Sequence, residues 1–181
     1  ADANSGTCFT GSIGNLTQSM LSEAGLEWSK VYRTTVIKQA IPNNDIRSLK
    51  LCGITLESEQ TNLWTEIKAL KPTCILALGS LALETLTGFK KLQEYRGSIL
   101  RSSDQTTKVV ATYNPGQLLV GNTEKGILKY SAKAYMQLDF NRAVEESKSK
   151  EYDIPNRLLQ VARNSYDLYK FLEQYRGRKY A

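Results

Sequence analysis

The feature that most constrains the fold is an apolar run that ends abruptly in a turn. Residues 109–111 read Val-Val-Ala, which is typical of a buried β-strand, and Asn114-Pro115-Gly116 follows shortly after. Proline has no N–H to give to a sheet ladder, so the strand must end before it. In α/β proteins ligands bind at the carboxyl ends of the strands. The sequence therefore places Asn114 where a binding site is expected.

A second strand unit lies upstream of the first. Cys74-Ile75-Leu76-Ala77-Leu78-Gly79 predicts a strand over residues 74–79, and Ser80 begins a run with helical spacing over residues 80–87. Two strand–helix crossovers imply a parallel sheet with helices on both faces. We therefore expect an α/β fold, a three-layer α/β/α arrangement with a short, mostly parallel central sheet and a C-terminal helical extension.

Periodicity and turn signals predict the other elements. They are a helix over residues 13–25, a strand over 30–38, a helix over 58–70, a long helix from Thr123 to about Ser149 with Ile127, Leu128, Tyr135, Leu138 and Val144 as packing positions, and a last helix capped by Asn156. Residues 1–150 are expected to form one domain, and residues 151–181 a helical extension or a linker to a following domain. A chain that is 41% hydrophobic and 23% charged can bury one substantial core.

Five segments, taken in order, resemble the uracil-DNA glycosylase superfamily, most closely its thermophile-type branch. They cover residues 6 to 120, about two thirds of the chain: Gly6 to Leu16 with its glycines and Phe9, Val31 to Lys38, Lys71-Pro72 before the Cys74 strand, Arg96-Gly97, and Lys108 to Leu119. No single motif is specific, but their joint order is. The resemblance implies a domain that binds DNA and draws a base out of the stack.

The resemblance implies a role for three residues and also shows where the chain departs from the family. Phe9 matches the phenylalanine that stacks on the extruded base, and Thr35 aligns with the asparagine that reads uracil. Asn114 stands where the family usually has a catalytic histidine, and the chain contains no His. A hydroxyl cannot replace the paired donor and acceptor of an amide. The family's water-activating loop is expected immediately before Ala1.

Each of these residues also has an ordinary structural interpretation. Asn114 before Pro115 is a common turn starter, although the mismatch-specific branch also uses Asn-Pro there and an amide could donate to a developing oxyanion. Phe9 could be a core residue. Thr35 is a normal β-branched choice for a strand.

The resemblance also suggests which residues would contact DNA. Ser80 and the helix start that follows would bind a phosphate, with Arg96 and Arg101 nearby, and Gln117-Leu118-Leu119 would form a wedge loop that enters the base stack. Leu118 and Leu119 could equally be buried. A net charge of +6 and a pI of about 9.2 favour phosphate contact without proving it.

Cysteine usage bears on cofactors and location. Thermophile-type relatives hold an iron–sulfur cluster with four cysteines, whereas this chain has three, Cys8, Cys52 and Cys74, and Gln39 follows Lys38. We therefore expect no cluster, no metal site and no other cofactor, although Cys52 is an imperfect candidate ligand. The sequence has no apolar run long enough to span a bilayer and no signal peptide, so we expect a cytoplasmic protein that binds no membrane.

Both ends of the chain look cut, and domains resembling this one occur at the amino termini of some bacteriophage DNA polymerases. We therefore expect a DNA-binding, glycosylase-like domain of a phage-type DNA polymerase or replication protein, weak or inactive as an enzyme and acting in the host cytoplasm. Its partners would be DNA and other polymerase domains. Two alternatives stay open: an active DNA glycosylase on uracil or a modified pyrimidine, and a non-catalytic docking domain for polymerase domains or a processivity partner.

Overall fold

Three short strands form the central sheet in the computed structural model, which describes residues 8–42, 45–119, 126–152, 163–174 and 176. They are β1 (Cys74–Leu78), β2 (Ile99–Arg101) and β3 (Lys108–Thr112), arranged in the order β1-β3-β2. β1 and β3 are parallel with Cys74 opposite Lys108, and β2 is antiparallel to β3 with Arg101 opposite Lys108. The predicted α/β fold with a short central sheet is confirmed.

The sheet separates two hydrophobic clusters because its side chains alternate between the two faces. On β1, Ala77 lies in one cluster, whereas Leu76 and Leu78 pack against the other. On β3, Val109 and Ala111 share the cluster of Ala77. This alternation is what a pleated strand requires, and it lets helices cover both faces.

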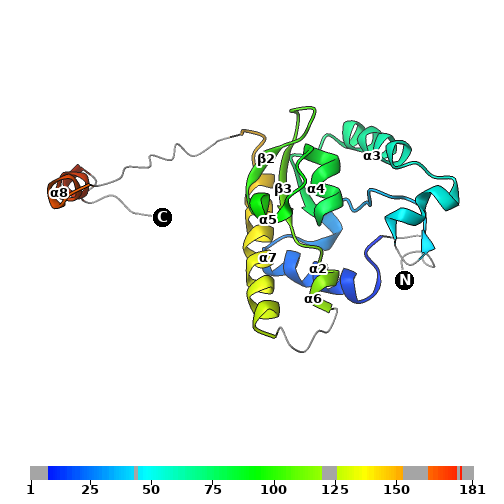
Figure 1. Cartoon of the computed structure of the whole chain (residues 1–181), viewed down its shortest axis with the longest axis horizontal. Helices are drawn as coiled ribbons and strands as arrows, with labels where there is room; N and C mark the ends of the chain where they lie inside the picture. Colours follow the sequence, from blue (N-terminus) through cyan, green and yellow to red (C-terminus); the bar gives the residue numbers. More distant parts are fainter. Residues whose placement is uncertain (1–7, 43–44, 120–125, 153–162, 175, 177–181) are drawn as a thin grey trace.

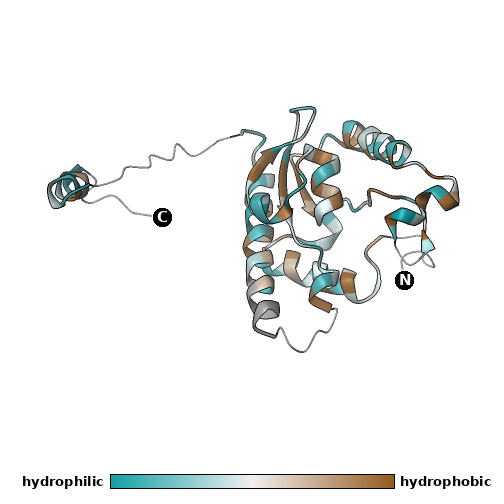
Figure 2. Ribbon diagram, viewed as in Figure 1, coloured by the Kyte–Doolittle hydropathy of each residue, from teal (hydrophilic) through white to brown (hydrophobic). Residues whose placement is uncertain are grey.

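Helices form the two outer layers of the three-layer fold (Figure 1). One face carries α2 (Gly11–Glu23) and α7 (Gly126–Ser147), which bury Met20, Leu21, Met136, Phe140 and Val144 together. The other carries α3 (Leu56–Leu70), α4 (Ser80–Thr87) and α5 (Leu92–Tyr95), which bury Leu63, Ile67, Leu83, Leu86 and Leu92. Figure 2 shows hydrophobic residues gathered on the strands and on the helix faces toward them.

The strand predicted over residues 30–38 is absent. A short 3-10 helix, η1 (Trp28–Lys30), is followed by irregular backbone, although Val36 still packs against the core cluster of α3 and α4. The segment forms hydrogen bonds to side chains of α3 rather than to a neighbouring strand. The Lys38 N–H donates to Glu59, and the Thr34 hydroxyl donates to Glu66 at 2.8 Å. β-branched residues favour strands only when a neighbouring strand is there to pair with them.

The long C-terminal helices differ from the prediction in their packing. α7 exists, but Met136, Asp139 and Phe140 face the core, whereas the predicted packing residues Tyr135 and Leu138 are 47% and 63% exposed. Val144 is buried as predicted, and the side chains of Ile127 and Leu128 lie outside the described residues, as does the predicted cap Asn156.

Two short elements and a final helix complete the chain. They are η3 (Ile46–Cys52), α6 (Gly116–Leu119) directly after Pro115, and α8 (Ser165–Gln174), which is drawn apart from the other helices in Figure 1. Within the part of the chain that the structure describes, no helix is long and apolar enough to span a bilayer.

Candidate functional site

The ends of β1 and β3 meet at one edge of the sheet. The Gly79 N–H donates to the Thr112 carbonyl at 2.8 Å, so the two chains leave the sheet side by side. Gly79 adopts a positive φ of 92°, and a Cβ there would lie 3.4 Å from the Cβ of Asn114. Ser80 then starts α4 with its side chain exposed. The structure thus brings Ser80 and Asn114 to one edge, as predicted.

The side chain of Asn114 has a defined local role. Its Oδ1 accepts a 2.9 Å hydrogen bond from the N–H of Gly116, the first residue of α6. This is the bond by which Asn fixes a turn, and it satisfies a donor at the start of the short helix. The amide Nδ2 keeps two N–H groups for other partners. Asn114 is therefore both a turn residue and a possible neutral donor at an exposed edge.

The segment that carries Phe9 joins the same edge through α2. Phe9 has a positive φ of 61°, and its carbonyl lies so close to Gly14 that a Cβ there would be only 1.7 Å from the oxygen. One turn along, the Ile13 side chain approaches Gly116, since a Cβ on Gly116 would lie 3.2 Å from Ile13 Cδ1. The glycine spacing of this segment therefore reflects close backbone packing beside the strand ends. Phe9 itself is partly buried.

Thr35 uses its hydroxyl locally. Its Oγ1 donates to the Ile37 carbonyl at 2.7 Å, and the residue lies on irregular backbone rather than on a strand. The base-reading role that the resemblance suggested for Thr35 would require this bond to be exchanged for one to the base. That role stays a prediction.

The predicted wedge is a single helical turn rather than a loop. Gln117 is exposed and Leu119 is 42% exposed, whereas Leu118 is partly buried and packs against the cluster of α2 and α7. The structure thus divides the three residues: Gln117 and Leu119 face solvent beside Asn114, and Leu118 anchors the turn. Only Leu119 is an exposed apolar side chain of the kind that enters a base stack.

Arg96 lies in a partly buried ion pair. Its Nη1 contacts both carboxylate oxygens of Asp139, at 3.0 and 2.8 Å, and Asp139 also accepts from Thr112 Oγ1 at 2.7 Å. The guanidinium lies over the rings of Tyr135 and Tyr113, 4.5 and 5.6 Å from their centroids. The charge of Arg96 is thus matched inside the protein, which leaves it less available for a phosphate than the sequence suggested.

Asp139 anchors this network from α7. Its side chain is 5% exposed, and burial raises the pKa of its carboxyl, while the hydrogen bond from Thr112 and the charge of Arg96 oppose that rise. The bond to Thr112 ties α7 to the last residue of β3, two residues before Asn114. Sequence reasoning missed Asp139. The sequence pattern that could have revealed it is a carboxylate that stands between the core residues Met136 and Phe140 on the same helix.

Arg101 does not lie at this edge. It is on β2 opposite Lys108, at the amino end of β3, whereas Asn114 follows the carboxyl end. The first and last residues of β3 are four residue steps apart, which is about 13 Å along the strand. The Arg101 guanidinium stacks instead on Tyr152, 4.4 Å from the ring centroid. The structure therefore does not bring together Ser80, Arg96 and Arg101 as one phosphate site.

No metal site is evident among the described residues, where no group of three or more His, Cys, Asp or Glu side chains converges. Cys8, Cys52 and Cys74 are free thiols. Burial raises the pKa of Cys74 to about 11, an effect that nearby Lys108 opposes, so this thiol is neutral at physiological pH.

The comparisons with known proteins agree with the arrangement of these segments. Residues 1–139 match the family described as the Uracil DNA glycosylase superfamily. A Type-4 uracil-DNA glycosylase from Archaeoglobus fulgidus is 27% identical over 124 residues, covering 63% of this chain and 59% of that protein. The chain thus spans about three fifths of the length of the curated relative it matches. On the family match, which covers more than half of its length, the chain belongs to the uracil-DNA glycosylase superfamily.

Proposed function

We propose that this chain is a DNA-binding domain of the superfamily with weak or no glycosylase activity. The observation that carries the proposal is Asn114, whose side-chain oxygen bonds the Gly116 N–H in a chain that has no His. A protonated imidazole can offer a full positive charge to a leaving base, whereas a primary amide offers a neutral donor. One preorganised donor contributes about 2.7–4 kcal/mol to catalysis in a site that excludes water. Asn114 is exposed to solvent and does not meet that condition.

DNA binding is supported by the groups at the same edge. The start of α4 at Ser80 presents backbone N–H groups that favour phosphate, and Gln117 and Leu119 lie on the neighbouring turn. The chain also carries a net charge of +6. These groups do not depend on the catalytic histidine that the family usually has and this chain lacks. DNA binding can therefore persist without catalysis.

The test is incubation with uracil-containing single- and double-stranded DNA, followed by alkali to cleave abasic sites. We expect little or no strand cleavage and an unchanged result for Asn114→Ala. Turnover that is lost in Asn114→Ala would favour the second candidate, an active glycosylase. The two N–H groups that Asn114 Nδ2 keeps after Oδ1 bonds Gly116 are the observation in its favour.

We propose further that residues 1–150 form the glycosylase-like domain and that residues 151–181 connect it to the rest of a phage-type DNA polymerase. The exposed apolar side chains of α8 support this, because Leu168, Tyr169 and Leu172 are about half exposed or more. Such a helix gains by packing on another domain. If the chain binds no DNA by fluorescence anisotropy at low ionic strength, docking to neighbouring domains becomes the better account.

A further inference from the structure

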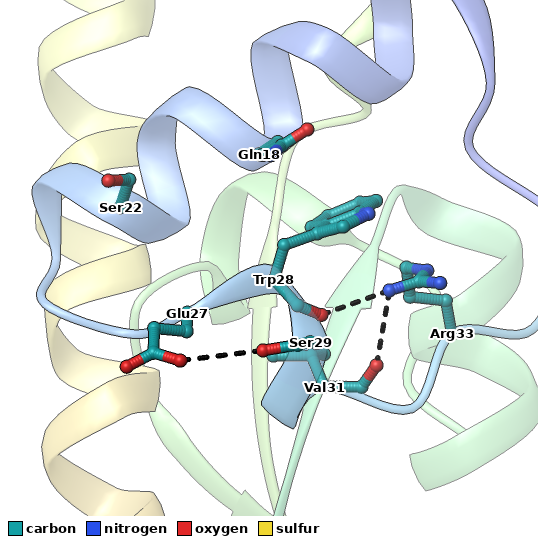
Figure 3. Close-up of a pocket in the computed structure, with 7 residues that line it drawn as sticks. All are labelled: Gln18, Ser22, Glu27, Trp28, Ser29, Val31 and Arg33. Carbon is teal, nitrogen blue, oxygen red and sulfur yellow. Dashed lines mark hydrogen bonds between the residues drawn. The ribbon is translucent and has the colours of Figure 1, made fainter.

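A pocket lies between α2 and the segment that follows it, away from the strand ends (Figure 3). It has a volume of about 600 Å³ and is lined by Gln18 and Ser22 of α2, by Glu27, Trp28 and Ser29, and by Arg33. Gln18 and Ser22 are five and nine residues beyond Ile13, or about 7 and 13 Å along the helix axis. The pocket is therefore separate from the edge at Asn114 but on the same helix.

Arg33 differs from the other partly buried cations that the structure describes. Among the Lys and Arg residues whose side chains the structure describes, three are not exposed: Arg33 and Arg96 are partly buried, and Lys108 is buried. Arg96 is paired with Asp139 and Lys108 with Glu146, each at 2.8 Å. The described residues offer Arg33 no carboxylate.

Arg33 is held in place by other contacts. Its Nη1 donates to the carbonyls of Trp28 and Val31 at 3.0 and 3.4 Å, and its guanidinium lies 4.4 Å from the centroid of the Trp28 ring. A guanidinium has five N–H donors, so these carbonyls leave several donors unused. Arg33 is therefore a partly buried cation that is held in one place and has no carboxylate partner among the described residues.

The walls of the pocket add further polar groups. The Gln18 amide, the Ser22 hydroxyl and the Trp28 indole N–H have no hydrogen-bond partner among the described residues. The acidic side chain of the lining, Glu27, is paired with Lys30 at 2.9 Å and lies at the opposite end from Arg33 in Figure 3. Trp28 lies beside Arg33, whereas Ser22 lies at the end of the pocket that holds Glu27 (Figure 3).

We infer that this pocket binds a phosphate group of a nucleic-acid strand, as a second contact beyond the edge at Asn114. The guanidinium fork matches phosphate oxygens, and hydroxyl and amide donors complete such a site. A volume of about 600 Å³ exceeds what a bare ion fills and suits a nucleotide unit. The inference rests on the proposed DNA-binding function for its choice of ligand.

Trp28 can report on the pocket directly. The chain has two tryptophans, and Trp64 packs against the other hydrophobic cluster, so Trp64→Phe leaves Trp28 as the single emitter. Fluorescein-labelled oligothymidylate is titrated by anisotropy, which reports binding anywhere on the protein. Unlabelled oligothymidylate and tripolyphosphate are titrated by Trp28 emission, which reports binding at the pocket. We expect the oligonucleotide to change the emission over the same concentrations that raise the anisotropy.

A charge placed in the pocket gives the decisive variant, with a matched control on the same helix. Ser22→Glu adds a carboxylate to the lining of the pocket, and Ser19→Glu adds the same charge at an exposed position that does not line the pocket. Both residues are exposed on α2, so both variants should keep the wild-type circular dichroism spectrum. We expect Ser22→Glu to weaken oligonucleotide binding about tenfold or more and to abolish the Trp28 response, since a carboxylate in the lining repels a phosphate. Ser19→Glu should change affinity by about twofold or less.

The possible failures are distinguishable. Oligonucleotide binding with a silent Trp28, or equal effects of Ser22→Glu and Ser19→Glu, would overturn the pocket and leave the proposed function intact. If the protein without either glutamate substitution binds no oligonucleotide, both the pocket and the proposed function are overturned. A Trp28 response to tripolyphosphate without one to the oligonucleotide would overturn the strand as ligand and identify a free phosphate compound in its place.

Discussion

Replacing Gly97 with alanine tests the packing that holds Arg96 at the site. Gly97 has a positive φ of 68°, and a Cβ there would lie 2.5 Å from Asp139 Oδ1. Its N–H donates to the Ala111 carbonyl at 2.8 Å, so the backbone of β3 resists its displacement. Gly97→Ala should therefore force the Asp139 carboxylate to move.

The magnitude follows from two terms. An alanine held in the left-handed region costs about 1–2 kcal/mol. To reach an ordinary contact, Oδ1 must retreat from 2.5 Å to at least 3.4 Å, and Asp139 accepts bonds of 2.7 to 3.0 Å from Thr112 and Arg96. Losing one bond to a charged group costs about 1.5–3 kcal/mol. The free energy of unfolding should fall by about 2.5–5 kcal/mol in all.

Gly53 provides the matched control for this change. Its φ of 70° is almost the same, and a Cβ there would meet nothing within 4 Å. Gly53→Ala should therefore show the backbone cost alone, about 1–2 kcal/mol. In urea unfolding followed by circular dichroism, Gly97→Ala should be the more destabilised, and the excess should vanish in an Asp139→Ala background. Equal destabilisation of the two glycine variants would refute the argument.

Three other predictions concern separate parts of the protein. Leu118→Ala should weaken DNA binding but leave the slope of the logarithmic affinity against salt unchanged, because it removes packing and no charge; a smaller slope in anisotropy titrations would contradict this. At pH 8 a thiol reagent should modify exposed Cys52 rapidly and partly buried Cys74, with its pKa of about 11, much more slowly. Equal labelling rates would contradict the raised pKa of Cys74. Burial raises the pKa of Glu66, but hydrogen bonds from Lys38 and a neighbouring threonine bring it below its usual value, so this group stabilises the fold above about pH 4.3 and the effect is lost as pH falls through the folded pKa. Glu66→Gln should therefore cost about 1 kcal/mol or less at pH 7, since the pair is partly exposed, and nothing in strong acid, as measured by urea unfolding at both pH values.

The strand ends were predictable because their signals are local. Apolar runs bounded by Gly79 and by Asn114-Pro115 place β1 and β3 to within a residue or two, and the helix after Gly79 follows from its spacing. Burial on both faces favours a run of apolar side chains in the middle of a strand, and a turn requires particular residues. The predicted strand over residues 30–38 failed because its stability depends on a neighbouring strand, which sequence spacing does not reveal.

The contacts across the fold were not predictable in the same way. Arg96 and Asp139 are 43 positions apart, and only the packing of α7 on β3 brings them together. The same packing rotates α7 so that Asp139 faces the sheet and Tyr135 lies beside Arg96, which reverses the expected role of Tyr135 as a core residue. Arg33 and Trp28 are only five positions apart in the sequence. The hydrogen bond from Arg33 to the Trp28 carbonyl nevertheless exists only because the backbone turns after η1.

The turn at Asn114 shows how the edge can keep its shape without the family's usual electrophile. What Asn114 gives the turn is an acceptor, the Oδ1 that bonds the Gly116 N–H, whereas stabilising a departing base requires a donor. Gly116 permits this turn because a Cβ there would lie 3.2 Å from both Asn114 Oδ1 and Ile13 Cδ1. The local geometry therefore depends on the amide oxygen and the glycine, and neither depends on a charged side chain. Groups that would hold a strand, the start of α4 and the pocket at Arg33, lie on other elements, so selection for binding can preserve them independently of catalysis.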